Sequence, residues 1–273
     1  MPELPEVEVL RRSLEPLIVG SNIESVQVWN PDLREPVDRR RLAECRGRQI
    51  VAARRRAKYL LLDLAGEQTL VVHLGMSGRL TLVPKADPRE PHEHLALFLD
   101  SGQRLRFRDT RRFGLVLLRH TPRLASDRHF KHLGLEPLQA GLTGAALRQL
   151  AIGRRGPVKS FLMDGRIVVG VGNIDAAEAL YLAGIPPRRS VARFSETRWE
   201  RLAVAVRTTL SAAIDQGGTT LNDFADAEGR SGYFHVSLSV YDRAGEGCGR
   251  CGGTVRRIVQ GGRSTFYCPG CQK

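Results

Sequence analysis

The sequence contains no long apolar run, and no segment approaches the roughly 18–20 residues that a membrane span requires. It opens with no basic stretch followed by an apolar one, so we expect no secretory signal. Cysteine is scarce before the end of the chain: Cys45 stands alone, and the other four cysteines lie in the last 26 residues. This distribution does not suit a disulfide framework. We therefore predict a cytoplasmic protein with no membrane partner, in which Cys45 is a half-buried thiol.

Acidic residues are the minority among the charged ones. The 273 residues include 29 Asp and Glu against 42 Lys and Arg, which gives a formal net charge of +13. A chain of this length can form two domains with a sizeable core. The basic excess indicates nucleic acid or another anionic surface as partner, and a basic protein without a polyanionic ligand is the alternative. The sequence also lacks internal repeats and low-complexity tracts.

The first half of the chain combines one helix with many strands. Residues 6–15 predict a short helix with Val7, Leu10 and Leu14 on its apolar face, and Pro16 and Gly20 are expected to kink or end it. Short β-rich segments then follow at close spacing, which is typical of a sandwich or barrel. These segments are residues 23–29, 50–54, 59–64, 69–73, 80–83, 95–99, 105–108 and 115–118, with a hairpin connection at 100–103.

The second half is predicted to be helical. The best helix spans residues 195–214, where Ser195 is a suitable N-cap and Gly217-Gly218 ends it. A polar, glycine-containing loop covers residues 217–238, and the turn-rich stretch 121–142 joins the two halves. Shorter helices are expected at 143–152, 158–163 and 174–182. The predicted fold is therefore α+β, with domains at 1–133, 134–239 and 240–273.

The tail carries the most specific motif. Two CxxC pairs, with a 16-residue gap between them, match the spacing of a four-cysteine zinc site: Cys248, Cys251, Cys268 and Cys271. Four thiolates leave no open position, so we predict one structural Zn²⁺ and no catalytic metal. The gap reads as a β-hairpin that turns at Gly261-Gly262. A tail this small has too little core to fold alone, so the metal must supply much of its stability.

The amino terminus offers a nucleophile. Removal of Met1 would make Pro2 the terminal residue, and an α-amino group has a reference pKa of about 7.7–8.0. Such an amine is partly neutral at physiological pH and can form a Schiff base with a carbonyl-like carbon. Glu3 and Glu6 lie within four residues of it and are candidates for moving protons. The alternative is a Pro/Glu-rich start that only leads into the helix.

Several motifs together resemble a known family. They are Met1–Glu8, His73–Gly78, Asp109–Gly114 and the cysteine tail. The chain resembles the bacterial formamidopyrimidine-DNA glycosylases, and the resemblance runs from Pro2 to Lys273. It implies an N-terminal β-sandwich with a leading helix, a helix-two-turn-helix domain and a zinc-finger hairpin. It also implies a monomeric enzyme that binds damaged double-stranded DNA, excises oxidised purines through Pro2 and cuts the strand by β,δ-elimination.

The resemblance assigns roles to single residues. Pro2 attacks the sugar, Glu3 protonates it, Glu6 orients the terminus, and Lys58 and Arg263 assist the later steps. The gap left by the flipped base is filled by Met76, Arg111 and Phe113. The remaining DNA contacts that it implies are His73, His92, Arg155, Lys159 and Asn173.

Two departures from the family pattern stand out. Asp175 replaces the usual tyrosine, and a carboxylate at a phosphate-facing helix start is repulsive unless it turns away or caps the helix. Asp242 replaces a glycine. Two other functions stay open: an endonuclease VIII-like glycosylase for oxidised pyrimidines, and a catalytically silent binder of damaged DNA. A panel of paired lesions separates the first. A silent binder would not need Pro2, Glu3 and Lys58 together, so their joint presence argues against the second. The loop 217–238 is expected to govern lesion choice.

Overall fold

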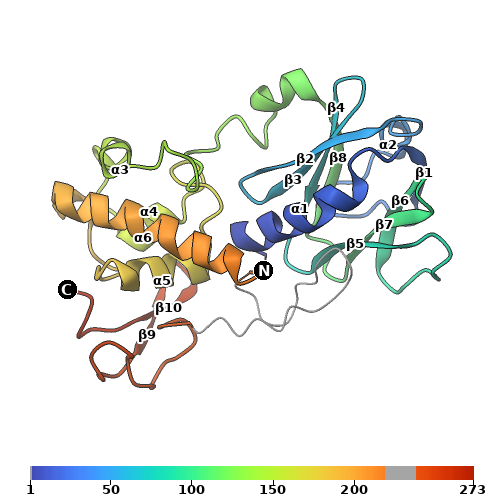
Figure 1. The fold of residues 1–273 in the computed structure, drawn as a ribbon. Coiled ribbons are helices and arrows are strands. Elements are labelled where there is room, and N and C mark those ends of the chain that lie inside the picture. The colour runs from blue at the N-terminus through green and yellow to red at the C-terminus, as the bar shows by residue number, and fades with distance from the viewer. Residues whose placement is uncertain (1, 219–237) are drawn as a thin grey trace. The chain divides into compact units, whose positions relative to one another are not determined.

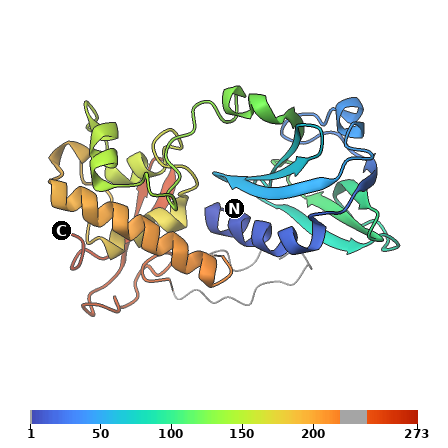
Figure 2. The same ribbon diagram turned by 45° about the horizontal axis from the view of Figure 1, so that its top comes forward.

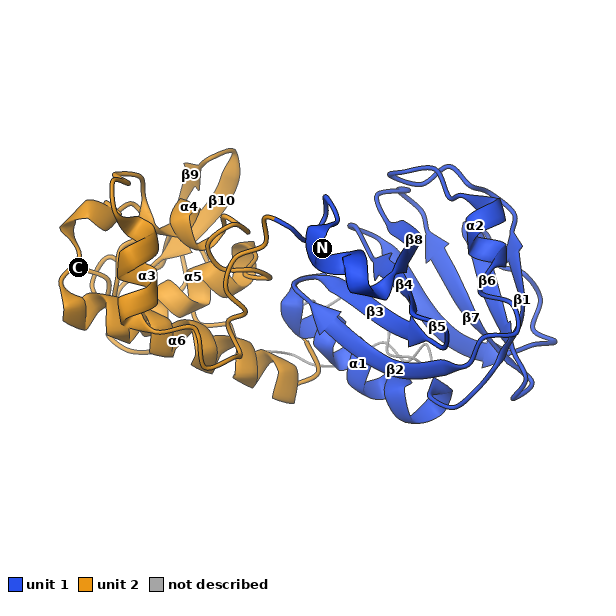
Figure 3. Cartoon of the chain, turned by 90° about the horizontal axis from the view of Figure 1, so that it is seen from above, with its two compact units in different colours: residues 1–131, 220–234 blue, residues 132–219, 235–273 orange. Residues whose placement is uncertain are grey.

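The computed structural model describes residues 2–218 and 238–273, and its chain divides into two compact units (Figure 3). Among the described residues, the first unit contains 2–131 and the second contains 132–218 and 238–273. Most of the loop that was expected to govern lesion choice lies outside the described residues. In the described part of the chain, no helix combines the length and apolar character that crossing a membrane requires.

The first unit is a β-sandwich with a leading helix, as predicted. Its two four-stranded antiparallel sheets have the orders β1-β6-β7-β5 and β2-β3-β4-β8. Their elements are α1 (Leu4–Ile18), β1 (Ile23–Val28), α2 (Arg39–Ala43), β2 (Ile50–Arg56), β3 (Tyr59–Leu64), β4 (Gln68–His73), β5 (Gly78–Pro84), β6 (Glu93–Leu99), β7 (Gln103–Asp109), β8 (Leu115–His120) and the 3₁₀ turn η1 (Thr121–Ser126).

One hydrophobic core joins both sheets and the helix. Alternate residues of β6 and β7, such as Leu97 and Leu105, meet Leu62 and Leu70 of the other sheet. The helix α1 lies along β2 and β3 (Figure 1, Figure 2) and adds Val7, Leu10, Leu14 and Ile18 to the same core. Burying this stripe stabilises the fold by removing apolar surface from water. The amino terminus is thereby attached to a rigid sandwich.

The helix α1 is longer than the sequence indicated. It begins at Leu4 and continues through Pro16 to Ile18, and it ends only before Gly20, whose φ is +96°. Of the two residues expected to kink or end the helix, Pro16 does not end it, and the end falls just before Gly20. Proline in the last turn removes a single backbone hydrogen bond, and packing of Ile18 in the core offsets that loss.

The sequence also missed the helix α2. It has five residues, three of which are arginines, and the side chain of Asp38 caps it by accepting a hydrogen bond from the backbone N–H of Arg41 at 3.0 Å. A segment this short has almost no periodicity, so the N-cap residue was its only signal.

The second unit is helical and carries the hairpin tail. Its elements are α3 (Gly144–Ala151), α4 (Val158–Leu162), α5 (Asn173–Leu182), η2 (Val191–Arg193), α6 (Glu196–Asp215), β9 (Arg256–Gln260) and β10 (Arg263–Tyr267). The Ser195 hydroxyl caps α6 as predicted. Trp199, Leu202, Val206 and Leu210 of α6 pack against α3 and α5.

The tail forms the predicted hairpin. Gly261 and Gly262 make a two-residue turn in which both φ values are positive, at 57° and 73°, and β9 and β10 pair antiparallel on either side. Glycine suits this type I′ geometry because it has no Cβ to clash. A separate cluster buries Val255 and Phe266 of the tail with Ala177 and Tyr181 of α5. The tail therefore borrows part of its core from the helical domain.

Candidate active site and metal centre

The predicted nucleophile lies at the first turn of α1. Pro2 is buried, and the side chains of Glu3 and Glu6 are 3% and 0% exposed. Glu3 is the N-cap, and Glu6 Oε2 accepts a hydrogen bond from the Glu3 backbone N–H at 2.7 Å, in a capping box. The capping-box motif S/T-x-x-E is present here in a variant form, with glutamate in place of serine or threonine at the N-cap. This box fixes the backbone of Glu3, the residue that follows Pro2, through the Glu6 carboxylate.

Lys58 lies on a turn that is attached to the same helix. Ala57 and Lys58 form the connection between β2 and β3, and Ala57 has a left-handed φ of 55°. Arg55 donates a hydrogen bond to the Ala57 carbonyl at 3.0 Å and also pairs with Glu8 of α1 at 3.0 Å. The Lys58 turn therefore has a charged link to the helix that follows Pro2.

Glu8 is the anchor of that link. Its carboxylate forms ion pairs with Arg11, Arg12 and Arg55 at N–O distances of 2.9–3.0 Å. Burial alone would raise the pKa of Glu8, but the hydrogen bonds from the three arginines outweigh burial and lower it. A buried carboxylate needs such partners because leaving it unpaired is costly. No local pattern indicates this cluster, since Arg55 lies 47 positions away from Glu8.

His73 closes β4 beside the Lys58 turn. It pairs across the sheet with Tyr59, and the two rings meet at 4.8 Å between centroids. Its Nδ1 accepts a hydrogen bond from the Gly75 backbone N–H at 2.9 Å. Burial is the main cause that lowers the pKa of His73, from 6.5 to about 4. The nearby positive charges of Arg34, Lys58 and His129 lower it in the same direction. His73 is therefore a neutral imidazole at physiological pH.

The depressed pKa of His73 predicts a loss of stability in acid. Between pH 6.5 and 4 the unfolded chain protonates His73 and the folded chain does not, so the free energy of unfolding falls as pH falls through this window. The full effect is about 3 kcal/mol at most. Urea unfolding across this pH range measures it, and His73→Asn should show a shallower decline. Equal slopes for both proteins would contradict the prediction.

Met76, Arg111 and Phe113 lie on two loops that touch. Met76 is in the β4–β5 connection, and the other two are in the β7–β8 connection. Gly75 has a φ of 65°, and a Cβ there would come within 2.4 Å of the Phe113 backbone. Phe113 is 45% exposed, and the Arg111 guanidinium lies 5.1 Å from its ring centroid. The structure therefore brings the three predicted gap-filling residues to one edge of the sandwich.

His92 lies next to this edge. It is exposed, has a φ of 63°, and its carbonyl accepts a hydrogen bond from the Asp109 backbone N–H at 3.1 Å. The next residue, Glu93, is buried and forms ion pairs with Arg104 and Arg106. His94 Nε2 is hydrogen-bonded to the Asp109 carbonyl at 2.7 Å.

In the second unit, Lys159 and Asn173 form a buried polar junction. Lys159 is 2% exposed, and its ammonium donates to Asn173 Oδ1 at 2.6 Å, Thr265 Oγ1 at 2.6 Å and the Ser264 carbonyl at 3.3 Å. Asn173 Nδ2 donates to the Ser264 carbonyl at 3.0 Å. An ammonium has three donors, so these partners use all of them. The Lys159 ammonium therefore binds groups of its own unit, and its predicted contact with DNA stays a prediction.

Arg155 and Arg263 are both exposed. Arg155 lies in the loop before α4, where its carbonyl accepts a hydrogen bond from the Ser190 hydroxyl at 2.7 Å. Arg263 begins β10 directly after the Gly261-Gly262 turn. Their guanidinium groups are thus accessible to a phosphate.

The four tail cysteines converge as a metal site requires. Their sulfur atoms all lie within 4.8 Å of one another, with Cys248 and Cys271 at 3.7 Å and Cys251 and Cys268 at 3.5 Å. A tetrahedral ion with metal–sulfur distances of about 2.3 Å places its ligands roughly 3.8 Å apart. Within the described ranges this is the one group of three or more His, Cys, Asp or Glu that could hold a metal. The geometry fits a closed, structural metal site.

Side chains around the cysteines orient them. The Tyr181 hydroxyl lies 3.2 Å from Cys248 Sγ, and this hydrogen bond lowers the pKa of Cys248 to about 6. Gln272 accepts from the Cys268 backbone N–H at 2.8 Å and donates to the Ile185 carbonyl at 2.8 Å. Such outer contacts hold metal ligands in place. Cys45, by contrast, is fully rather than half buried, and burial raises its pKa to about 12.

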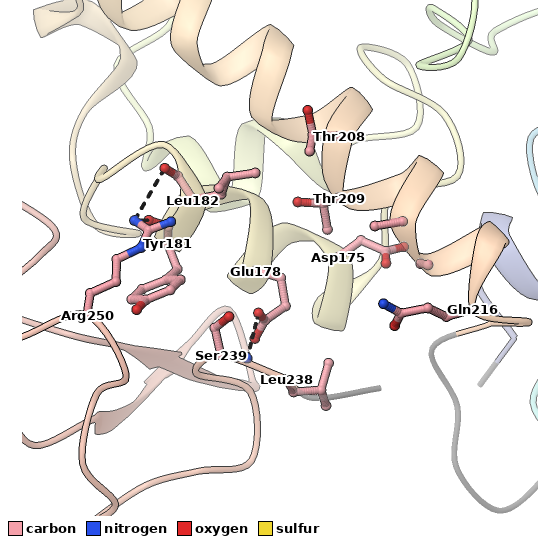
Figure 4. Close-up of a pocket in the computed structure, with 12 residues that line it drawn as sticks. Asp175, Glu178, Tyr181, Leu182, Thr208, Thr209, Gln216, Leu238, Ser239 and Arg250 are labelled. Atoms are coloured by element: carbon pink, nitrogen blue, oxygen red, sulfur yellow. Dashed lines mark hydrogen bonds between the residues drawn. The ribbon is translucent and has the colours of Figure 1, made fainter. Parts of the chain in front are cut away.

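Asp175 turns away from the surface. It is 1% exposed in the first turn of α5 and lines a pocket of about 180 Å³ between α5 and α6 (Figure 4). Glu178, one turn later, accepts hydrogen bonds at 2.9 Å from three successive backbone N–H groups, those of Ser239, Val240 and Tyr241. Sequence reasoning missed Glu178 because its partners lie about sixty positions further along the chain.

Comparison with known proteins finds three domain matches along the chain, and they agree with this architecture. Residues 1–116 match the formamidopyrimidine-DNA glycosylase N-terminal domain, residues 133–225 match the H2TH domain of the same enzymes, and residues 245–273 match the zinc finger found in FPG and IleRS.

Full-length relatives agree with the domain matches. The chain is 49% identical to the formamidopyrimidine-DNA glycosylase of Cupriavidus pinatubonensis and 48% identical to that of Dechloromonas aromatica, with complete coverage of each. It also matches the Lactococcus lactis Fpg in complex with DNA containing an abasic site, with a TM-score of 0.90, 32% identity and 99% coverage of both chains.

The fold and the matched domains define a DNA glycosylase of base excision repair. More narrowly, the chain belongs to the formamidopyrimidine-DNA glycosylase family.

Proposed function

We propose that the chain is a bifunctional DNA glycosylase and AP lyase that excises oxidised purines, 8-oxoguanine and formamidopyrimidines, from damaged duplex DNA. The observation that carries this proposal is the buried first turn of α1, where the capping box holds Glu3 and Glu6 beside Pro2. A nucleophile at a chain end is effective only when its position is fixed. The solved relatives in complex with abasic and Fapy-dG-containing DNA support the same substrate class.

The proposed reaction begins with extrusion of the damaged base. Loss of base stacking costs a few kcal/mol. Met76, Arg111 and Phe113 enter the gap and replace part of that stacking. The neutral Pro2 amine then attacks C1′ and the bond from C1′ to the base breaks. The nitrogen loses its proton, the C1′–O4′ bond opens to leave an iminium at C1′, and Glu3 supplies a proton to the opening sugar or the departing base. Glu6 keeps the terminus in place through the Glu3 N–H.

Strand cutting follows from the covalent intermediate. The iminium at C1′ acidifies the C2′ proton, whose loss expels the 3′ phosphate. A second elimination expels the 5′ phosphate, and water then releases Pro2. Lys58, on the turn beside α1, and the exposed Arg263 are proposed to assist these steps. His73, His92, Arg155 and Asn173 are proposed DNA contacts, while Lys159 is proposed to hold Asn173 and the hairpin.

We further propose that the four cysteines hold one Zn²⁺, whose role is to fold the tail. The protein is proposed to work in the cytoplasm as a monomer with domains 1–133, 134–239 and 240–273.

Borohydride trapping tests the proposal. Duplex DNA with 8-oxoguanine opposite cytosine should give a covalent adduct that maps to Pro2. If only DNA with a preformed abasic site is trapped, the lyase stands and the purine assignment fails. If nothing is trapped while the duplex is bound, the protein is a silent binder of damaged DNA.

One solved relative favours a second substrate class. The Lactococcus lactis enzyme is also described in complex with DNA containing an oxidised pyrimidine, at a TM-score of 0.90. A panel of oxidised pyrimidines should therefore accompany the purine lesions. Faster excision of the pyrimidines would reverse the proposed preference.

Salt dependence separates the roles of two basic residues in the second unit. Each phosphate contact contributes about −0.9 to the slope of log K against log salt. Arg155→Ala removes an exposed cation and should make the slope shallower by about 1. Lys159→Gln should weaken binding with the slope unchanged, because its ammonium is already used inside the unit. A shallower slope for Lys159→Gln would show that Lys159 contacts phosphate directly.

A further inference from the structure

Asp109, at the end of β7, is a buried carboxylate with an unusual set of partners. Its side chain is 0% exposed. Oδ1 accepts hydrogen bonds from the Ser77 hydroxyl at 2.6 Å and from the Arg111 backbone N–H at 3.3 Å, and Oδ2 accepts from the Gly114 backbone N–H at 2.7 Å. Within residues 2–218 and 238–273, Asp109 forms no ion pair with a cationic side chain. Neutral donors from two loops therefore hold this carboxylate.

Ser77 completes the connection between the loops. Its hydroxyl donates to Asp109 and accepts a second hydrogen bond from the Arg111 backbone N–H at 3.0 Å. Ser77 belongs to the β4–β5 loop and Arg111 to the β7–β8 loop. One hydroxyl and one carboxylate thus join two segments that lie 32 or more positions apart in the sequence.

Two glycines lie where the loops have no room for a Cβ atom. A Cβ at Gly75 would lie 2.5 Å from the Phe113 carbonyl oxygen. A Cβ at Gly114 would lie 2.6 Å from the Phe107 ring and 3.0 Å from Asp109 Oδ2. A Cβ at Gly75 would therefore clash with the backbone of the other loop, and one at Gly114 would displace the Phe107 ring and crowd the Asp109 carboxylate.

This network touches every gap-filling residue through its backbone or a neighbour. Met76 immediately precedes Ser77, and Phe113 immediately precedes Gly114. Arg111 is bound through its own N–H. The side chains of Met76, Arg111 and Phe113 themselves stay out of the network, which leaves them available for insertion into DNA.

We propose that Asp109, acting through Ser77, is a positioning residue that couples the two loops, so that Met76, Arg111 and Phe113 enter the duplex as one preorganised unit. This inference rests on the gap-filling role proposed above. Ordering the loops before DNA arrives removes an entropic cost from the step in which the base leaves the stack. Asp109 itself touches neither DNA nor the reacting atoms.

The coupling predicts a selective defect. Ser77→Ala removes the shared hydroxyl while Asp109 keeps its bonds to the β7–β8 loop. Excision of 8-oxoguanine from the intact duplex should slow by about tenfold, the effect of losing one interaction of about 1.4 kcal/mol. Strand cutting at a preformed abasic site should change by less than about threefold, because no base has to leave the stack there. Ser77→Thr keeps the hydroxyl and should restore excision.

Fluorescence of a 2-aminopurine next to the lesion reports the step directly. Its rise on mixing with protein follows local unstacking, and Ser77→Ala should slow that rise as much as it slows excision. Asp109→Asn should give a larger defect of the same kind, since an amide has one acceptor oxygen where the carboxylate uses two. Ser126→Ala is the matched control, because its exposed hydroxyl donates to the Arg123 carbonyl in the same unit.

The outcomes are distinguishable. Wild-type fluorescence kinetics in Ser77→Ala, equal defects in the alanine and threonine variants, or parallel losses on lesion and abasic DNA would each overturn the coupling. If the wild-type protein forms no Pro2 adduct with either DNA, the proposed function fails. The fluorescence comparison then still decides the coupling, because it needs binding and unstacking but no covalent chemistry.

Discussion

Replacing Pro2 with glycine is expected to reduce strand cutting by about a hundredfold or more, while some base excision survives. Glycine still offers a terminal amine with a similar reference pKa. It lacks the ring that fixes φ near −65°, so the amine is no longer held in one position beside Glu3. A misplacement of about 1 Å at a reacting group is enough to cost a factor of this size.

The chemistry of the intermediate adds to this loss. A secondary amine gives an iminium that has no N–H to lose, so its positive charge persists and keeps the C2′ proton acidic. The imine of a glycine amine is cationic only while it is protonated. Elimination should therefore suffer more than base release, and the ratio of cut to uncut abasic product should fall.

Gel analysis of lesion-containing duplex, with and without hot alkali, measures both steps in one experiment. Alkali cuts abasic sites that the enzyme leaves intact, so it reveals excision without strand cutting. Ser13→Ala is the control, because it removes a hydroxyl that donates to the Leu10 carbonyl on the same helix, at 3.0 Å. Strand cutting at the normal rate by Pro2→Gly would refute the assignment of Pro2 as nucleophile.

Removal of the metal is expected to unfold the tail and to abolish tight binding of duplex DNA. Structural zinc contributes roughly 10–16 kcal/mol in small zinc peptides, which is comparable with the whole stability of a typical domain. The tail buries few apolar side chains of its own and shares them with α5. Without the ion, the four sulfur atoms, which all lie within 4.8 Å of one another, lose the bonds that would join them.

Cys268→Ser tests this without a chelator. Metal analysis should fall from one zinc per chain to near none, proteolysis should cleave within residues 240–273, and duplex affinity should drop by more than about tenfold. Cys45→Ala is the matched control, since Cys45 is a buried cysteine of the first unit and is no part of the cluster. Unchanged affinity in a metal-free protein would contradict a structural role for zinc.

Much of the fold followed from local patterns. The strands of the sandwich were predicted from β-branched and leucine-rich segments between turn residues, and β3 matches the expected 59–64 at both ends. The hairpin followed from two adjacent glycines between CxxC pairs. These features depend on neighbours in the sequence, so the sequence alone was informative.

The site depended on distant partners and was less predictable. Lys159 was predicted to contact DNA, and the sequence did not indicate its acceptors, which lie 14, 105 and 106 positions away and bury its ammonium. The role of Asp109 depends on Ser77, 32 positions earlier. Periodicity cannot report such contacts. Resemblance to the family indicated which residues are near the chemistry, and the structure adds what holds them there.

Helix α5 has an amphipathic pattern too weak to orient it from the sequence, because two different cores bury it. Ala176, Ala179 and Leu180 face the helical core, while Ala177 and Tyr181 face the tail cluster beside Cys248. Helix α5 therefore lies between the helical core and the tail cluster. The amides of α5 should therefore not exchange with solvent as one group, because loss of the tail exposes one side of the helix while the side facing the helical core remains packed. Native-state hydrogen exchange would then show whether this protein unfolds from its carboxyl end inwards, with α5 as the boundary at which opening stops.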